Sequence, residues 1–241
     1  LIGIEMGRYS LDVEGLAYAG GEWDPMKYVT YQPDSDGIIP IYSKLGMEDG
    51  LTAKIIGLIK HVYGEDTYKQ NIDFIAEALG KNNNESSEET LNRYLNDGFY
   101  PDHLKIYQKR PIYWMFSSGK SNAFKCLIYL HRYTDDTLAI INSKYFLNES
   151  ARLNAEVEDT RLQLETAEGK DKLRLEKAYK ALQAKQKEMI EYGQVLDHMA
   201  NQYIHLDLDD GVKANYAKFQ GIEIVNDNGI TVKKDLLVPI K

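Results

Sequence analysis

The stretch ARLNAEVEDTRLQLETAEGKDKLRLEKAYKALQAKQKEMIEYGQVLDHMANQY, residues 151–203, decides the fold. Its apolar residues recur in alternating steps of three and four, the spacing of the seam between two packed helices. The seam positions are Leu153, Val157, Thr160, Leu164, Ala167, Leu175, Ala178, Leu182, Lys185, Met189, Tyr192, Leu196, Met199 and Tyr203. A break at residues 168–171 predicts a short connector, and two long helices joined in this way run antiparallel. A solvated charged helix is the alternative, but the regular seam, with Lys185 as the one polar residue of its second half, favours a helical hairpin.

Two shorter helices are predicted ahead of this hairpin. Residues 47–62 place their apolar side chains on one helical face, and Gly64 ends the pattern. Residues 67–79 repeat the arrangement, and Gly80 ends it in the same way. This part of the chain is therefore expected to be helical.

A third helix is marked by the sequence that begins at Ser86. Ser86 and Glu89 have the spacing of a capping box, in which each side chain accepts a hydrogen bond from the backbone amide of the other residue. Gly98 is expected to break this helix. Pro101 suits the first position of another short helix, because a proline there loses no helical hydrogen bond.

Strands are predicted on both sides of the turn-rich residues 117–122. Residues 112–116 and 124–130 are aromatic and branched, as the strands of a β-hairpin are, although a buried helix remains open for the second run. Residues 38–42 are expected to form a short strand. Near the end of the chain, the turn at residues 226–229 predicts a small terminal hairpin.

These elements predict an α+β fold that is predominantly α, with a helical domain, a small antiparallel β-hairpin and a long antiparallel coiled-coil helical hairpin. Four divisions of the chain are expected. They are an irregular arm at residues 1–42, a helical and β-hairpin domain at 43–133, the helical hairpin at 134–205, and a C-terminal segment at 206–241 that packs back on the domain.

The charge of the chain is unevenly distributed. The net charge of −8 argues against a protein that simply coats nucleic acid. Residues 101–132 are the exception, with six basic residues against one acidic residue. No apolar run approaches the length of a membrane span, and the start of the sequence does not have the pattern of a signal peptide.

The residues that commonly hold metals lack the spacing that a metal site requires. The five histidines form no zinc-binding pair, so no metal is expected. Asp207, Asp209 and Asp210 resemble part of a calcium loop but lack its later ligands, and they are expected to form a turn and a cap. Cys126, the single cysteine, lies in an apolar run and is expected to be buried, in a protein of a reducing compartment.

The sequence also lacks a complete catalytic motif. Gly119, Lys120 and Ser121 match the end of a phosphate loop, but the earlier glycine and the parallel-strand context are missing, so Lys120 is expected at a hairpin tip. No acidic pair followed by a lysine on a strand indicates a nuclease. No dinucleotide fingerprint and no Asn-Pro-Pro-Tyr box occur. No catalytic residue and no cofactor are therefore expected in this chain.

The basic segment is the candidate for binding. Its cations are Lys109, Arg110, Lys120, Lys125 and Arg132, and they alternate with Tyr107, Tyr113, Trp114, Tyr129 and Tyr133. Basic and aromatic side chains on a hairpin suit contact with a phosphate backbone. The alternative is that Tyr113, Trp114 and Tyr129 are core residues, and that the lysines and arginines are exposed at the edges of that core. The composition leaves both interpretations open.

The same segment resembles a known family. Residues 109–118 (KRPIYWMFSS) and 124–133 (FKCLIYLHRY) resemble the C-terminal region of the PglX-type adenine-specific DNA methyltransferases of bacterial phage-exclusion (BREX) systems. Large type II restriction-methylation enzymes have a similar stretch. Residues 7–18 resemble the segment that follows the methylase domain in that family, and residues 207–219 resemble its closing motif. The resemblance spans nearly the whole chain.

The resemblance implies a part of a larger protein of the bacterial cytoplasm. The methylase domain, with its S-adenosylmethionine site, would precede this chain, which lacks an initiator Met. The family's C-terminal half implies recognition of double-stranded DNA, with the five cations near phosphates and the helical hairpin as a ruler or docking arm. The alternative is a protein-interaction module that binds other defence-system subunits or a phage inhibitor.

Overall fold

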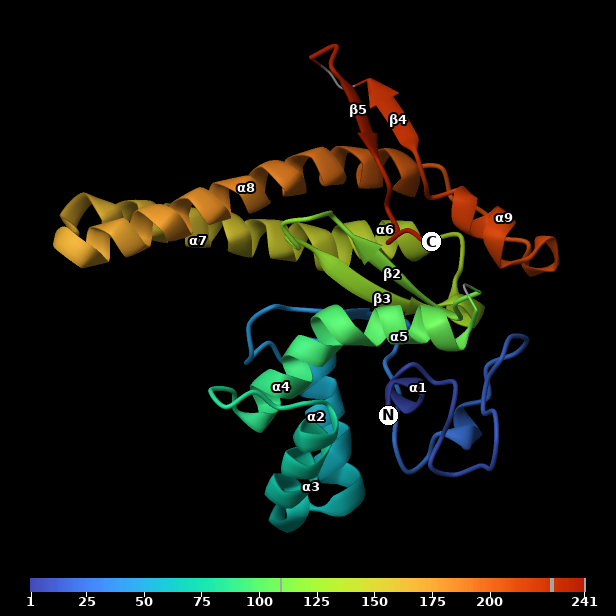
Figure 1. Ribbon diagram of the computed structural model, residues 1–241. Coiled ribbons are helices and arrows are strands. Elements are labelled where there is room, and N and C mark those ends of the chain that lie inside the picture. The colour runs from blue at the N-terminus through green and yellow to red at the C-terminus, as the bar shows by residue number, and fades with distance from the viewer. Residues whose placement is uncertain (109, 226–227, 241) are drawn as a thin grey trace. The chain divides into compact units, whose positions relative to one another are not determined.

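A computed structural model describes residues 1–108, 110–225 and 228–240 (Figure 1). The chain divides into two compact units. Unit 1 comprises Leu1–Met115, Lys125–Tyr133 and Ile240, and unit 2 comprises Phe116–Phe124 and Thr134–Pro239. The helices and the two small antiparallel sheets confirm the predicted fold class, α+β and predominantly α.

Unit 1 begins with a largely irregular segment. Its regular pieces are the short helix α1 (Ile2–Glu5), the 3-10 turn η1 (Pro25–Lys27) and the strand β1 (Ile38–Pro40). The short strand predicted in this region is thereby confirmed. Turn-forming residues dominate the remainder, which explains why no longer element forms.

Three helices follow, as Figure 1 shows. They are α2 (Leu51–Tyr63), α3 (Glu65–Ala78) and α4 (Ser87–Arg93). Gly64 has a φ of 84° and separates the first two, because few other residues adopt that backbone conformation cheaply. The predicted capping box is present: Ser86 accepts from the amide of Glu89, and Glu89 accepts from the amide of Ser86.

The break predicted at Gly98 is wrong. The chain continues from α4 through a π-helical turn, η2 (Tyr94–Gly98), into α5 (Phe99–Ile106), so that Pro101 is the third residue of α5. Pro101 cannot donate the hydrogen bond of a helix interior, and the π-helical turn lies directly before the first turn of α5, which contains Pro101. A glycine is needed at position 98 because a Cβ atom there would lie 2.6 Å from the ring of Tyr94.

The three-stranded sheet has the order β1–β3–β2. The strands β2 (Tyr113–Ser117) and β3 (Lys125–Tyr129) confirm the predicted hairpin, and a helix for the second run is excluded. In the antiparallel pairing of β1 with β3, Ile39 lies opposite Leu127. Every residue of β3 is buried, which is typical of a central strand covered on both faces. The 3-10 turn η3 (Leu130–Arg132) follows it.

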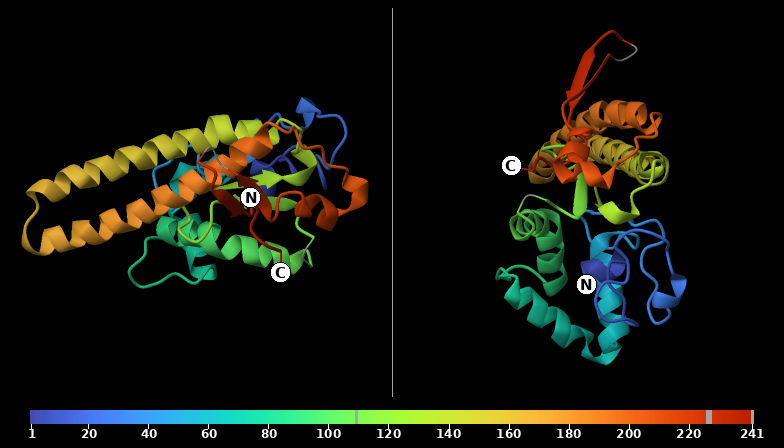
Figure 2. Two further views of the ribbon diagram at one scale, coloured as in Figure 1. Left: turned by 90° about the horizontal axis from the view of Figure 1, so that it is seen from above. Right: turned by 90° about the vertical axis from the view of Figure 1, so that its right-hand side faces the viewer.

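Unit 2 contains the predicted helical hairpin. Its first arm runs without interruption through α6 (Thr137–Ile140), the π-helical η4 (Ile141–Phe146) and α7 (Leu147–Thr166). Its second arm is α8 (Gly169–Ala200). The two arms lie side by side and antiparallel in both Figure 1 and Figure 2, and the connector is shorter than predicted, at residues 167–168.

The predicted seam is buried over only part of its length. Its buried members are Leu153, Val157, Thr160, Leu182, Met189, Tyr192, Leu196 and Met199. Towards the connector, Ala178 is exposed, and Leu164 and Leu175 are only partly covered. Tyr203 lies outside the helix and is 59% exposed. The seam therefore predicted the pairing of the arms but overestimated its extent, because two helices alone cover little surface.

The remainder of unit 2 is short elements. They are η5 (Leu208–Asp210), α9 (Val212–Ala217), β4 (Ile222–Val225) and β5 (Thr231–Lys234). The last two pair antiparallel and confirm the terminal hairpin; of its turn, residues 226 and 227 lie outside the described residues. Aromatic rings form the centre of the unit, with Phe124 edge-on to Phe146 at 5.4 Å and Phe116 edge-on to Phe219 at 5.9 Å.

Candidate nucleic-acid interface

Two of the predicted phosphate-contacting residues are exposed. Arg110 lies between α5 and β2 in unit 1, and its side chain forms no hydrogen bond or ion pair with any residue that the structure describes. Lys120 lies in unit 2, at the predicted tip of the β2–β3 loop, and is equally free of described partners. Lys109, the third predicted residue, lies outside the described residues.

The loop that carries Lys120 is held by one carboxylate. Glu188, on α8, accepts hydrogen bonds from the Ser118 hydroxyl and the Ser121 amide, both at 2.7 Å, and from the Ala123 amide at 3.4 Å. Burial by itself would raise the pKa of Glu188, but these donors outweigh it and the pKa is lowered. Glu188 therefore positions the loop as an ionised group, a role that no pattern in the sequence indicates.

Gly119 makes this contact possible. Its φ is 135°, and a Cβ atom there would lie 3.1 Å from a carboxylate oxygen of Glu188. A larger residue would be strained in its backbone and would crowd the carboxylate. The glycine thus leaves room for the Glu188 side chain to approach the loop, whereas the glycine of a phosphate loop leaves room for a bound ligand.

Lys125, a predicted phosphate contact, points inward from β3. The residue is 8% exposed, and its ammonium donates to the Asn96 carbonyl at 2.9 Å and lies 3.6 Å from the Asp97 carboxylate. Burial lowers the pKa of Lys125, an effect that Asp97 partly offsets. The side chain joins the sheet to the π-helical turn within unit 1.

Arg132, another predicted phosphate contact, is bound to the irregular segment. Its guanidinium donates to the Asp34 and Ser35 carbonyls, both at 2.7 Å, and lies 4.5 Å from the centre of the Trp23 ring. Gly37, at a φ of 70°, leaves room for it, since a Cβ atom there would lie 3.1 Å from the guanidinium. Carbonyl oxygens thus take the donors that a phosphate would require.

The aromatic residues of the segment belong to the core. Tyr113, Trp114 and Tyr129 are 6%, 0% and 0% exposed, which confirms the core interpretation that the composition had left open. The Trp114 indole donates to the Pro111 carbonyl at 3.0 Å, and the Tyr129 hydroxyl donates to the Tyr18 carbonyl at 2.8 Å. The hydrogen-bonding groups of Trp114 and Tyr129 are therefore engaged within unit 1.

Other predicted sites are structural. Cys126 is buried, as predicted, and burial raises the pKa of its thiol. Asp207 caps η5 by accepting from the Asp209 amide at 2.9 Å, which confirms the predicted turn and cap. Among the described residues, no group of three His, Cys, Asp or Glu side chains is arranged to hold a metal ion.

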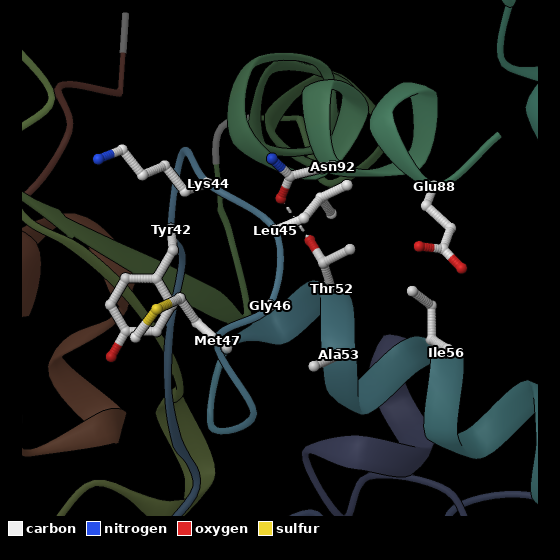
Figure 3. Close-up of a pocket in the computed structure, with 11 residues that line it drawn as sticks. Tyr42, Lys44, Leu45, Gly46, Met47, Thr52, Ala53, Ile56, Glu88 and Asn92 are labelled. Carbon is white, nitrogen blue, oxygen red and sulfur yellow. Dashed lines mark hydrogen bonds between the residues drawn. The ribbon is translucent and has the colours of Figure 1, made fainter. Parts of the chain in front are cut away.

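A pocket of about 210 Å³ lies in unit 1 between the start of α2, α4 and the preceding loop (Figure 3). Its apolar walls come from Tyr42, Leu45, Met47, Ala53 and Ile56. Its polar groups are engaged: the Asn92 amide oxygen accepts from the Thr52 hydroxyl at 2.6 Å, and Glu88 accepts from the Tyr68 hydroxyl at 2.6 Å. The pocket therefore suits an apolar group better than a phosphate or a base.

None of the helices in the described part of the chain combines the length and apolar character needed to cross a bilayer. The chain matches no protein-family model.

Comparison with known proteins identifies the class: over most of its length the chain is homologous to adenine-specific methyltransferases, which confirms the resemblance predicted from the sequence. It is 42% identical to adenine-specific methyltransferase BrxX of Escherichia coli O9:H4 (strain HS) over 230 residues, 90% of this chain. It is 41% identical to adenine-specific methyltransferase PglX of Lacticaseibacillus casei (strain Zhang) over 224 residues, 91% of this chain. The chain spans 19% and 18% of the length of these relatives.

Proposed function

We propose that this chain is a non-catalytic, C-terminal target-recognition and spacer region of an adenine-N6-specific DNA methyltransferase of a bacterial phage-defence system. The homology to BrxX and PglX carries this proposal, because it covers nine-tenths of the chain but about a fifth of either relative. Transfer of the methyl group from S-adenosylmethionine would belong to the remainder of the protein. The partner of this chain is double-stranded DNA.

Arg110 and Lys120 are the described residues best suited to phosphate contact. Both are exposed, and Glu188 holds the Lys120 loop in one conformation. A fixed loop loses less conformational entropy on binding than a mobile one. Lys125 and Arg132 contribute indirectly, by fixing the sheet and the irregular segment of unit 1.

The test is a charge reversal of Arg110 and Lys120, singly, in the full-length methyltransferase. Each variant is expected to bind duplex DNA more weakly and to reduce the slope of log affinity against log salt by about 0.9, the value for one lost phosphate contact. Lys177→Glu, an exposed change on α8, is the matched control. Unchanged binding by both variants would remove these residues from the interface.

Arg132→Lys separates a structural role from DNA contact. Lysine keeps the charge but loses the forked donors that bind two carbonyls, so the free energy of unfolding is expected to fall by about 1–3 kcal/mol. Arg110→Lys is the control and should leave stability unchanged. Urea denaturation measures both. Equal stability of the two variants would contradict the assigned role of Arg132.

A second candidate function is docking of other defence-system subunits by the helical hairpin. The observation that favours it is that Leu162 and Leu173, near the connector, are 49% and 68% exposed. Replacing both with Gln should weaken assembly with those subunits in size-exclusion chromatography without lowering stability. Leu147→Gln, at an exposed position of the same hairpin away from the connector, is the control. Unaltered assembly would leave this role without support.

A further inference from the structure

A cation without a counterion lies in unit 1. We call Arg8, Tyr9, Tyr107, Tyr129 and His131 the Arg8 cluster. Arg8 forms no ion pair with any residue in the described ranges of the chain. Its guanidinium lies 5.4 Å from the centre of the Tyr9 ring and interacts electrostatically with Tyr107 and Tyr129. Phenol groups, rather than carboxylates, therefore surround its charge.

The backbone holds Arg8 in place. Its amide donates to the Gly3 carbonyl at 2.8 Å, and its carbonyl accepts from the Ala17 amide at 2.9 Å. The first bond joins Arg8 to α1, and the second joins it to the segment at Ala17. The guanidinium is thus presented from a fixed position, which lowers the entropic cost of binding a ligand.

Two buried polar atoms of the cluster have no hydrogen-bond partner. They are Arg8 Nε and His131 Nδ1, and no other buried side-chain nitrogen or oxygen in the described part of the chain is unpaired. Buried polar groups are nearly always paired, so an unpaired one requires an explanation such as a ligand. The two residues also interact, because the charge of Arg8 acts on His131.

The chemistry of the cluster selects the ligand. A guanidinium offers forked donors that match an oxyanion, and the Tyr9 and Tyr107 hydroxyls can donate to the same kind of oxygen. The Tyr129 hydroxyl already donates to the Tyr18 carbonyl. Burial, and then the charge of Arg8, lower the pKa of His131. His131 is consequently neutral at neutral pH, and one of its ring nitrogens can donate without adding a second charge. The set suits a phosphate group approached by one cation and several neutral donors.

We propose that the Arg8 cluster is a binding site for a phosphate group, supplied by the DNA backbone or by a free phosphate compound. The first source rests on the proposed function, and the second does not. In either case Arg8 is the charged contact, and Tyr9 is the exposed neutral contact, with 40% of its surface accessible.

The first experiment measures thermal unfolding of the protein in inorganic phosphate and in chloride at equal ionic strength. A ligand that binds only the folded state raises its stability with concentration. The wild type is expected to unfold at a higher temperature in phosphate. Arg8→Gln should lose that difference, whereas Arg174→Gln, a change at an exposed position of α8, should keep it. If Arg8→Gln does not fold, Tyr9→Phe takes its place and should reduce the difference.

The second experiment measures duplex DNA binding of the same variants by fluorescence anisotropy across a salt series. A salt slope reduced by about 0.9 in Arg8→Gln supports the site with the DNA backbone as the source. Phosphate stabilisation without any effect on the duplex supports the site with a free phosphate compound as the source. If the wild type binds no duplex but is stabilised by phosphate, the proposed function fails and the site stands. Equal behaviour of wild type, Arg8→Gln and Tyr9→Phe in both experiments overturns the site.

Discussion

Glu188 accepts hydrogen bonds from three residues of a loop that precedes it by 65 to 70 positions. His103 makes a similar bond over a shorter separation of 10 positions, because its Nε2 accepts from the Tyr113 amide at 3.1 Å. In both cases a polar side chain accepts hydrogen bonds from backbone amides. Removing such an acceptor leaves a donor unpaired, which costs more than the bond itself contributes.

Glu188→Gln should therefore destabilise the protein by about 1–2 kcal/mol, since the amide lacks the charge and one acceptor of the carboxylate. Glu176→Gln makes the same change at an exposed position of α8 and should have no effect. Urea denaturation at neutral pH measures both. Equal midpoints for the two variants would show that the loop does not depend on Glu188.

His103 should make stability depend on pH. Burial, and then the charge of Arg8, lower its pKa to about 4. Because this pKa lies below the unfolded value of about 6.5, the unfolded state binds the proton more tightly. The contribution of His103 to stability is therefore complete above about pH 6.5 and is lost as the pH falls towards 4.

The measurement is the free energy of unfolding of wild type and His103→Gln between pH 7 and pH 4.5. The difference between the two proteins should shrink on acidification, because only the wild type must keep a buried imidazole uncharged. His198→Gln, at an exposed position of α8, should run parallel to the wild type. Parallel curves for His103→Gln as well would contradict the assignment.

At the scale of elements, the arms of the helical hairpin approach each other closely at Gly193. A Cβ atom there would lie 2.7 Å from the Phe146 ring, which is itself packed against Phe124 and Tyr192. Because the Phe146 ring is packed on two sides, it cannot easily move to make room for a methyl group at position 193. Gly57, in α2, is the contrasting case, because nothing lies within 4 Å of its Cβ position.

The same substitution should consequently have opposite effects at these two glycines. Gly57→Ala should stabilise by up to about 1 kcal/mol, the difference in helix propensity. Gly193→Ala should destabilise by about 1–3 kcal/mol in spite of that propensity, because it overpacks the crossing of the arms. Thermal unfolding compares the two. Stabilisation by both would mean that the arms separate readily at Gly193.

Local signals explain which elements the sequence predicted. Gly64, Gly80 and the Ser86–Glu89 box act within a few residues, so their effects are readable from the chain alone. Gly98 was misjudged because its role is to admit the Tyr94 ring in a continuing helix. The outer seam was overestimated because the pattern does not show whether another surface covers a residue, and Ala178 is exposed.

The candidate site was less predictable than the fold. Composition marked the basic segment, and Arg110 and Lys120 are indeed exposed. Lys125 and Arg132 have the same chemistry, yet carbonyls of residues 34–35 and 96 take their donors. Pairing with distant backbone is set by the tertiary fold, which short-range patterns do not encode. Glu188 gave no signal for the same reason.

At the scale of the whole molecule, the polypeptide passes between the two units within the β2–β3 hairpin. Unit 1 ends at Met115, inside β2, and resumes at Lys125, the first residue of β3. The strand β2 thus continues from one unit into the other, whereas β3 belongs to unit 1. Units joined through a shared strand are expected to unfold together.

Two probes can test this expectation. Both tryptophans, Trp23 and Trp114, belong to unit 1, whereas the two longest helices, α7 with 20 residues and α8 with 32, belong to unit 2. Tryptophan fluorescence and far-ultraviolet circular dichroism should give superimposable urea transitions. Two separated transitions would show that the units unfold independently.

The bond network of Glu188 limits how this region can be recombined between relatives. A chimera that exchanges only the helical hairpin would place a foreign residue 188 beneath the native loop of residues 118–123. The loop of residues 118–123 and α8 should therefore be exchanged as one unit, although they lie far apart in the sequence. Exchange of this region between relatives is expected to preserve the loop only when both segments are transplanted together.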